Sequence, residues 1–138
     1  MKTAINILIV FFSVLLIGCE SNPTNEGKIN SSIIGDWLWK STSGGFAGTT
    51  TTPTNGNVHI LKITIDSNFI EIRNDTITFT DKFSTRQYVF DDSLQSYLLI
   101  DFATSRRFNL FVTKLTTDSL ILSDMLIDGY SSLYTRIK

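Results

Sequence analysis

The chain has 138 residues, with 12 basic and 13 acidic side chains, a formal net charge of −1 and a single cysteine. This length suits one domain, and no basic patch favours nucleic acid as a partner. With one cysteine, no disulfide can form within the chain, so the domain must be held together by its own hydrophobic core.

Residues 1–18 have the pattern of an export signal. Lys2 supplies a positive charge, and residues 4–17 are apolar except for Asn6 and Ser13. A helix that spans a bilayer needs about 20 apolar residues, so this shorter run is typical of a signal peptide and not of a permanent membrane span. We therefore expect residues 1–18 to be removed on export.

The end of this run, Leu16-Ile17-Gly18-Cys19, resembles the lipobox of bacterial lipoproteins. The resemblance implies cleavage before Cys19, a diacylglycerol on its sulfur and a fatty acid such as palmitate on the new amino terminus. Each buried CH₂ contributes about 0.8 kcal/mol, so two or three acyl chains anchor a protein durably. Glu20 in place of Asp favours the outer membrane in well-studied sorting rules. The alternative is an ordinary secretory signal, which would leave Cys19 as an unpaired thiol.

Residues 19–32 predict a lipidated cysteine followed by a flexible tether, because they are polar and contain no periodic apolar residue before Ile33. A random coil of this length spans on the order of 20 Å. We expect the folded domain to occupy residues 33–138 and to sit in the bacterial cell envelope, with the membrane as its partner through the lipid anchor.

From residue 33 the chain consists of short runs of alternating apolar and polar residues, and no window keeps the period of an amphipathic helix. Alternation of this kind is typical of half-buried strands. It predicts nine strands, at residues 36–41, 58–65, 69–73, 76–82, 85–90, 97–102, 107–113, 119–123 and 132–137. The longest irregular stretch, residues 43–57, contains Gly44-Gly45 and a threonine tract, and we expect it to form a lid.

Short turns between these strands favour antiparallel neighbours in a meander, since a parallel crossover needs a dozen or more residues. An open meander would leave two exposed edges, whereas closure removes both. The sequence therefore predicts an all-β fold, an antiparallel up-and-down β-barrel of eight or nine strands, with a β-sandwich as the alternative.

Gly35-Asp36-Trp37 on the first predicted strand resembles the Gly-X-Trp signature of lipocalins, and more closely the short lipocalin-like domains of bacterial lipoproteins. In that family the tryptophan seals the closed end of the barrel, and an arginine from a late strand packs over its ring. The resemblance implies these structural roles for Trp37 and Arg136. The domain is shorter than a full lipocalin and has no apolar-periodic C-terminal helix, so its cavity could be shallow or filled.

Little in the sequence points to catalysis or to metal binding. His59 is the only histidine, and with Cys19 committed to lipid we expect neither a metal site, a catalytic residue nor a cofactor. We expect a non-enzymatic barrel that binds a small apolar or amphipathic ligand. The alternative is a protein-interaction or inhibitor module with a solidly packed barrel. The oligomeric state stays open. The candidate cavity residues are His59, Leu61, Ile63, Ile70, Ile72 and Phe79.

Overall fold

The computed structural model describes residues 33–89, 96–104, 108–124 and 126–138. The strands in these ranges are β1 (Gly35–Gly44), β2 (Thr49–Thr51), β3 (His59–Ile63), β4 (Asn68–Arg73), β5 (Thr76–Val89), β6 (Ser96–Phe102), β7 (Leu110–Leu115), β8 (Ser119–Asp124) and β9 (Tyr130–Arg136). Among the described residues, no helix has the length and apolar character to cross a membrane. The expected signal peptide, Cys19 and tether lie outside the described residues.

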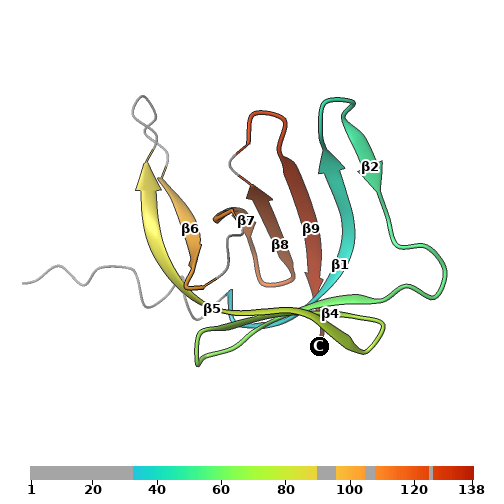
Figure 1. Ribbon diagram of the computed structural model, residues 1–138, viewed down its shortest axis with the longest axis horizontal. Helices are drawn as coiled ribbons and strands as arrows, with labels where there is room; N and C mark the ends of the chain where they lie inside the picture. Colours follow the sequence, from blue (N-terminus) through green and yellow to red (C-terminus); the bar gives the residue numbers. More distant parts are fainter. Residues whose placement is uncertain (1–32, 90–95, 105–107, 125) are drawn as a thin grey trace, which may run out of the picture.

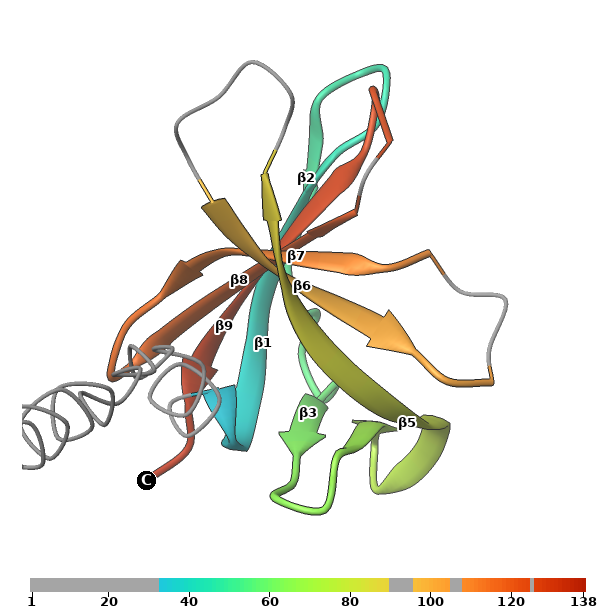
Figure 2. The same cartoon turned by 90° about the vertical axis from the view of Figure 1, so that its left-hand side faces the viewer.

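Eight of the nine described strands close into a barrel. From β3 to β9 each strand pairs antiparallel with the next, β1 pairs with β3, and β9 returns to pair with β1. Figure 1 shows β8, β9 and β1 side by side, and Figure 2 shows the long β5 curving around the sheet. Because β9 pairs with β1, the two edges that an open meander would expose are paired with each other. The predicted antiparallel, lipocalin-like barrel is confirmed, and the β-sandwich alternative is wrong.

β2 is the strand outside the closed barrel. It forms a hairpin with the end of β1, whose residues 42–44 pair with β2 along one edge and with β9 along the other. The sequence predicted an irregular stretch here. Threonine is a good strand former, and Gly45 and Gly48 supply the positive φ angles, 73° and 59°, that the hairpin needs.

β5 joins two segments that the sequence predicted as separate strands. Its first half pairs with β4 and its second half, from Phe83, pairs with β6. The predicted gap at residues 83–84 is part of the strand, because Phe83 pairs with Phe102 and Ser84 with Asp101. Just before this point, the Asp81 carboxylate is buried. It accepts hydrogen bonds from Lys82 N at 2.8 Å, Thr104 N at 3.2 Å and Thr104 Oγ1 at 2.7 Å.

Trp37 and Arg136 meet at one end of the barrel and seal it. The indole is fully buried, and its Nε1 donates to Ile33 O at 2.9 Å. Arg136 Cζ lies 4.0 Å from the Trp37 ring centroid, while its Nε donates to Thr117 O at 2.7 Å and its Nη1 to Ile34 O at 2.8 Å. The guanidinium thus stacks on the indole and links three segments of chain.

Gly35 makes room for this seal. Its φ is +148°, and a Cβ at this position would collide with Nη1 of Arg136. The positive φ favours glycine, and any side chain here would displace the Arg136 guanidinium from its contacts.

The core fills the barrel above the sealed end. Phe69, Phe79 and Phe102 contact one another edge to face, with ring centroids 5.0 to 6.1 Å apart. Such pairs contribute about 0.5–1.5 kcal/mol beyond burial alone. The buried residues of this core are Ile33, Trp37, Leu61, Ile63, Phe69, Leu98, Ile100, Val112, Leu120, Leu122 and Tyr134.

Candidate functional site

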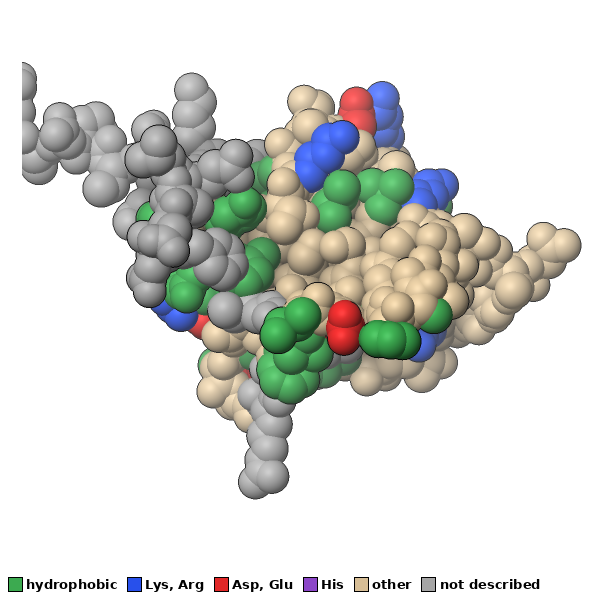
Figure 3. All heavy atoms as spheres, turned by 90° about the horizontal axis from the view of Figure 1, so that it is seen from above, with side chains coloured by type: hydrophobic (Ala, Val, Ile, Leu, Met, Phe, Trp, Pro, Cys, Tyr) green, Lys and Arg blue, Asp and Glu red, His purple; other side chains and the backbone are tan. Residues whose placement is uncertain are grey.

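A pocket of about 790 Å³ opens beside β1, β3, β4 and β9. The end of β2 and the segment that joins it to β3 form one of its walls. The lining is rich in hydroxyl, amide and aromatic side chains: Trp39, Thr42, Thr51, Thr52, Pro53, Thr54, Asn57, Val58, His59, Glu71, Arg73, Asn74, Tyr130, Ser132 and Tyr134. Seen from the end that carries the β1–β2 and β8–β9 hairpins, most of the described surface is uncharged polar side chains and backbone (Figure 3).

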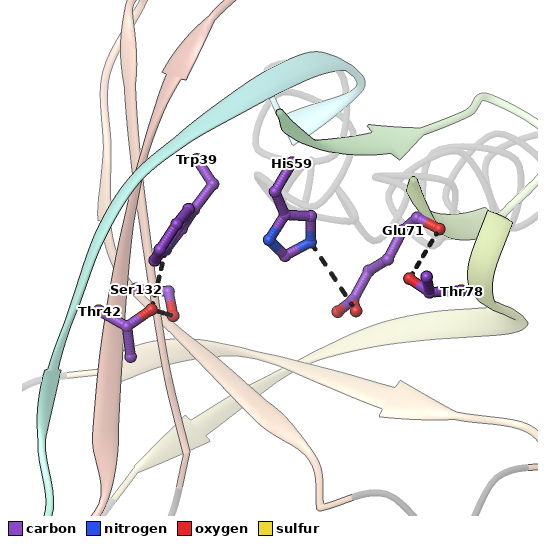
Figure 4. Close-up of polar contacts among 6 residues, drawn as sticks. All are labelled: Trp39, Thr42, His59, Glu71, Thr78 and Ser132. Carbon is purple, nitrogen blue, oxygen red and sulfur yellow. Dashed lines mark hydrogen bonds and ion pairs between the residues drawn. The ribbon is translucent and has the colours of Figure 1, made fainter. Parts of the chain in front are cut away.

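His59 and Glu71 face each other inside this pocket (Figure 4). Nε2 of His59 lies 3.9 Å from Oε2 of Glu71, and the two side chains are only 14% and 9% exposed. At this distance the contact is an ion pair only when the imidazole is protonated. The pair places a buried carboxylate in the wall of the pocket.

Aromatic rings flank the imidazole. The His59 ring centroid lies 5.8 Å from that of Trp39 and 6.4 Å from that of Tyr134. Trp39 Nε1 donates to Thr42 Oγ1 at 2.8 Å, and that hydroxyl shares a 2.8 Å hydrogen bond with Ser132 Oγ. These bonds fix the indole in the pocket wall, so its face has a defined position.

A smaller pocket of about 230 Å³ adjoins the first. The two share Glu71, Tyr130, Ser132 and Tyr134, and the smaller one continues to Leu110 and β8. Glu71 therefore borders both cavities.

The inward face of β4 carries Phe69, Glu71 and Arg73, since alternate residues of a strand share a face. Phe69 and Glu71 are buried and Arg73 is exposed at the pocket wall. The expectation that Ile70 and Ile72 line the cavity is wrong, because they alternate with these residues. A strand has two faces, and β4 turns its phenylalanine and glutamate inward.

Both isoleucines lie on the outer face instead, where Ile70 pairs with Lys62 and Thr80. Ile72 pairs with Ile60 on β3 and with Ile77 on β5, and Ile77 is 62% exposed. The partners of Ile72 lie on the outside of the barrel, so the outer face of these three strands carries a row of isoleucines beside polar side chains. This arrangement explains why hydrophobicity alone pointed to the wrong face of β4.

The other cavity candidates occupy different places. His59 lines the pocket. Leu61 and Ile63 are buried in the packed core below it, and Phe79 is a half-buried member of the aromatic cluster. Four of the six candidates named from the sequence are thus inward-facing, but the sequence missed most of the polar wall.

The expected lid is a fixed wall in its last part. Asn57 N donates to Thr54 O at 3.0 Å, and Asn57 Oδ1 accepts from Asn74 Nδ2 at 3.2 Å. Asn74 Oδ1 in turn accepts from Val58 N at 2.9 Å. These bonds tie the wall to the turn between β4 and β5.

The described ranges contain no group of three or more His, Cys, Asp or Glu side chains that could hold a metal ion. Cys19, the expected lipid attachment site, lies outside those ranges. No family model matches the sequence, and neither the search of curated proteins nor that of solved structures finds a match.

Proposed function

We propose that this protein is a lipid-anchored lipoprotein of the bacterial envelope, in the outer membrane, whose barrel binds a small amphipathic ligand in the pocket around His59 and Glu71. The observation that carries the proposal is the pocket of about 790 Å³ at the end of the barrel opposite the Trp37–Arg136 seal. Small-molecule sites are typically about 300–1,000 Å³ and combine aromatic side chains with a few placed polar groups.

Native mass spectrometry of the chain purified from its own host tests ligand binding. We expect a mass in excess of the protein, corresponding to a bound small molecule. Ser132→Trp should fill the pocket and abolish the excess mass, whereas Ser131→Trp, on the exposed opposite face of β9, should keep it. A chain that is always empty, or a ligand that survives Ser132→Trp, would contradict binding at this site.

The lipid anchor rests on the lipobox resemblance at Leu16-Ile17-Gly18-Cys19. Cells that express the full chain and receive an alkyne analogue of palmitate should label it, and Cys19→Ser should remove the label and release the protein from membranes. Unchanged membrane retention of Cys19→Ser would refute the anchor. This outcome is independent of the pocket.

A second candidate function is a protein-interaction module. Phe46 and Ile127, 95% and 104% exposed, project from two hairpins that touch through the 3.3 Å hydrogen bond from Gly45 N to Gly129 O. Two neighbouring apolar tips are a plausible contact for a partner protein. Under this function, Phe46→Asp should abolish crosslinks in intact cells. Ile65→Asp, in the exposed turn after β3, is the matched control.

A further inference from the structure

The inward face of β4 changes from apolar to acidic to basic along its length. Phe69 is fully buried, Glu71 is 7% exposed, and Arg73 is exposed where it lines the pocket. Residues two apart on a strand are separated by about 6.6 Å. One strand therefore presents a buried carboxylate and, one step nearer to solvent, a guanidinium.

The carboxylate of Glu71 and the guanidinium of Arg73 differ in burial and in their contacts. The Glu71 side chain is 9% exposed and 3.9 Å from His59. Arg73 takes no part in the ion pairs found among the described residues, which are His59–Glu71, Lys62–Asp36 and Arg86–Asp101. Its planar guanidinium group can therefore bind a carboxylate or phosphate of a ligand through two parallel hydrogen bonds.

The aromatic rings in the wall of this pocket also favour a cation. Trp39 and Tyr134 flank His59 and line the same pocket as Glu71. Indole and phenol faces attract an ammonium group, and more strongly when the site excludes water. A ligand cation would add a charge-assisted contact to the Glu71 carboxylate, beside the one that His59 makes.

We infer that the pocket selects a zwitterionic ligand, whose ammonium or other cationic group contacts Glu71 and whose anionic group contacts Arg73. This inference rests on the proposed ligand-binding function and names the chemical class of the ligand. The Cα atoms of these two β4 residues lie about 6.6 Å apart, so the two charges of the ligand must be separated by several bonds to reach both side chains. The fully packed floor at Phe69 and Leu61 excludes a long chain inserted along the barrel axis.

Three matched probes test the inference on the purified full chain: 6-aminohexanoate, hexylamine and hexanoate. Binding is followed by titration of Trp39 fluorescence, with Trp39→Phe to identify the reporting indole. We expect 6-aminohexanoate to bind about 10-fold or more tightly than either singly charged probe, because each charge-assisted contact contributes on the order of a factor of 10.

Two charge-removing variants then separate the two contacts. Glu71→Gln should weaken 6-aminohexanoate and hexylamine about 10-fold but not hexanoate, and Arg73→Gln should weaken 6-aminohexanoate and hexanoate but not hexylamine. Lys62→Gln, a base on the outer face of β3, is the matched control and should change none of them. The probe comparison on the unmodified chain needs no variant, so a folding defect in Glu71→Gln cannot hide the answer.

The possible outcomes distinguish this inference from the function on which it rests. Equal binding of a singly charged probe and 6-aminohexanoate would overturn the zwitterion and leave pocket binding intact. If neither these probes nor the native ligand of the host-purified chain occupies the pocket, both proposals fail.

Discussion

Replacement of Arg136 by Met tests the sealed end of the barrel. The change removes two hydrogen bonds from a charged donor, to Thr117 O and Ile34 O, and the stack on Trp37. Hydrogen bonds to charged groups contribute about 1.5–3 kcal/mol each, and a cation–π contact about 0.5–2 kcal/mol. These terms overlap and Met keeps part of the packing, so we expect a loss of about 3 kcal/mol in the free energy of unfolding.

Urea unfolding followed by tryptophan fluorescence measures this loss. For a slope of about 1.5 kcal/mol per molar urea, the midpoint should fall by about 2 M. The matched control is Arg86→Met. Arg86 also bonds a partner, Asp101 at 2.7 Å, and lies 5.7 Å from the Tyr88 ring centroid, but its side chain is 55% exposed. Exposed pairs contribute about 0–1 kcal/mol. Equal losses in the two variants would refute the view that the part-buried bond to Ile34 O and the stack on Trp37 make the Arg136 contacts the stronger ones.

Two further predictions concern the barrel wall. Asp81→Ala should destabilise the domain by about 2–3 kcal/mol, since it leaves the amide and hydroxyl of Thr104 without their shared acceptor, and hydrogen exchange of the Thr104 amide should rise with it. Leu61→Ala should cost about 2–5 kcal/mol because it opens a cavity in the core, whereas Ile72→Thr on the outer face should cost less than about 1 kcal/mol. If thermal unfolding showed a larger loss of stability for Ile72→Thr than for Leu61→Ala, the outward position of Ile72 would be contradicted.

The barrel itself could be predicted because its signals are local. Alternation along each strand and short turns between strands suffice for an antiparallel meander, and Trp37 near its start and Arg136 near its end mark the two strands that must meet. The bounds were less predictable. Residues 76–89 form one strand because residues 76–82 pair with β4 and residues 83–89 pair with β6, and no local pattern reveals that the two ladders are continuous.

The site was harder to predict than the fold. His59 shares its phase with the buried residues of β3, so its inward direction follows from alternation. In β4, either Phe69 and Glu71 or Ile70 and Ile72 could face the interior. Hydrophobicity alone favours the two isoleucines as the inward-facing pair. Ile72 faces outward because it pairs with Ile60 and Ile77 on the outer face of the neighbouring strands. That row of isoleucines forms only when the strands pair, so the sequence of β4 alone does not reveal it. A buried carboxylate therefore went unnoticed.

The described chain enters and leaves the barrel at the same place. Asp36 O accepts a hydrogen bond from Ile137 N at 2.8 Å, beside the Trp37–Arg136 pair and away from the pocket. A fluorescent protein fused after Lys138, or a sensor chip linked there, would accordingly leave the entrance to the pocket unobstructed. Because Asp36 and Ile137 are neighbours, a short linker could also join the two ends of the described domain, and the β1–β2 hairpin at Gly48 offers an exposed point at which to open a circularly permuted domain.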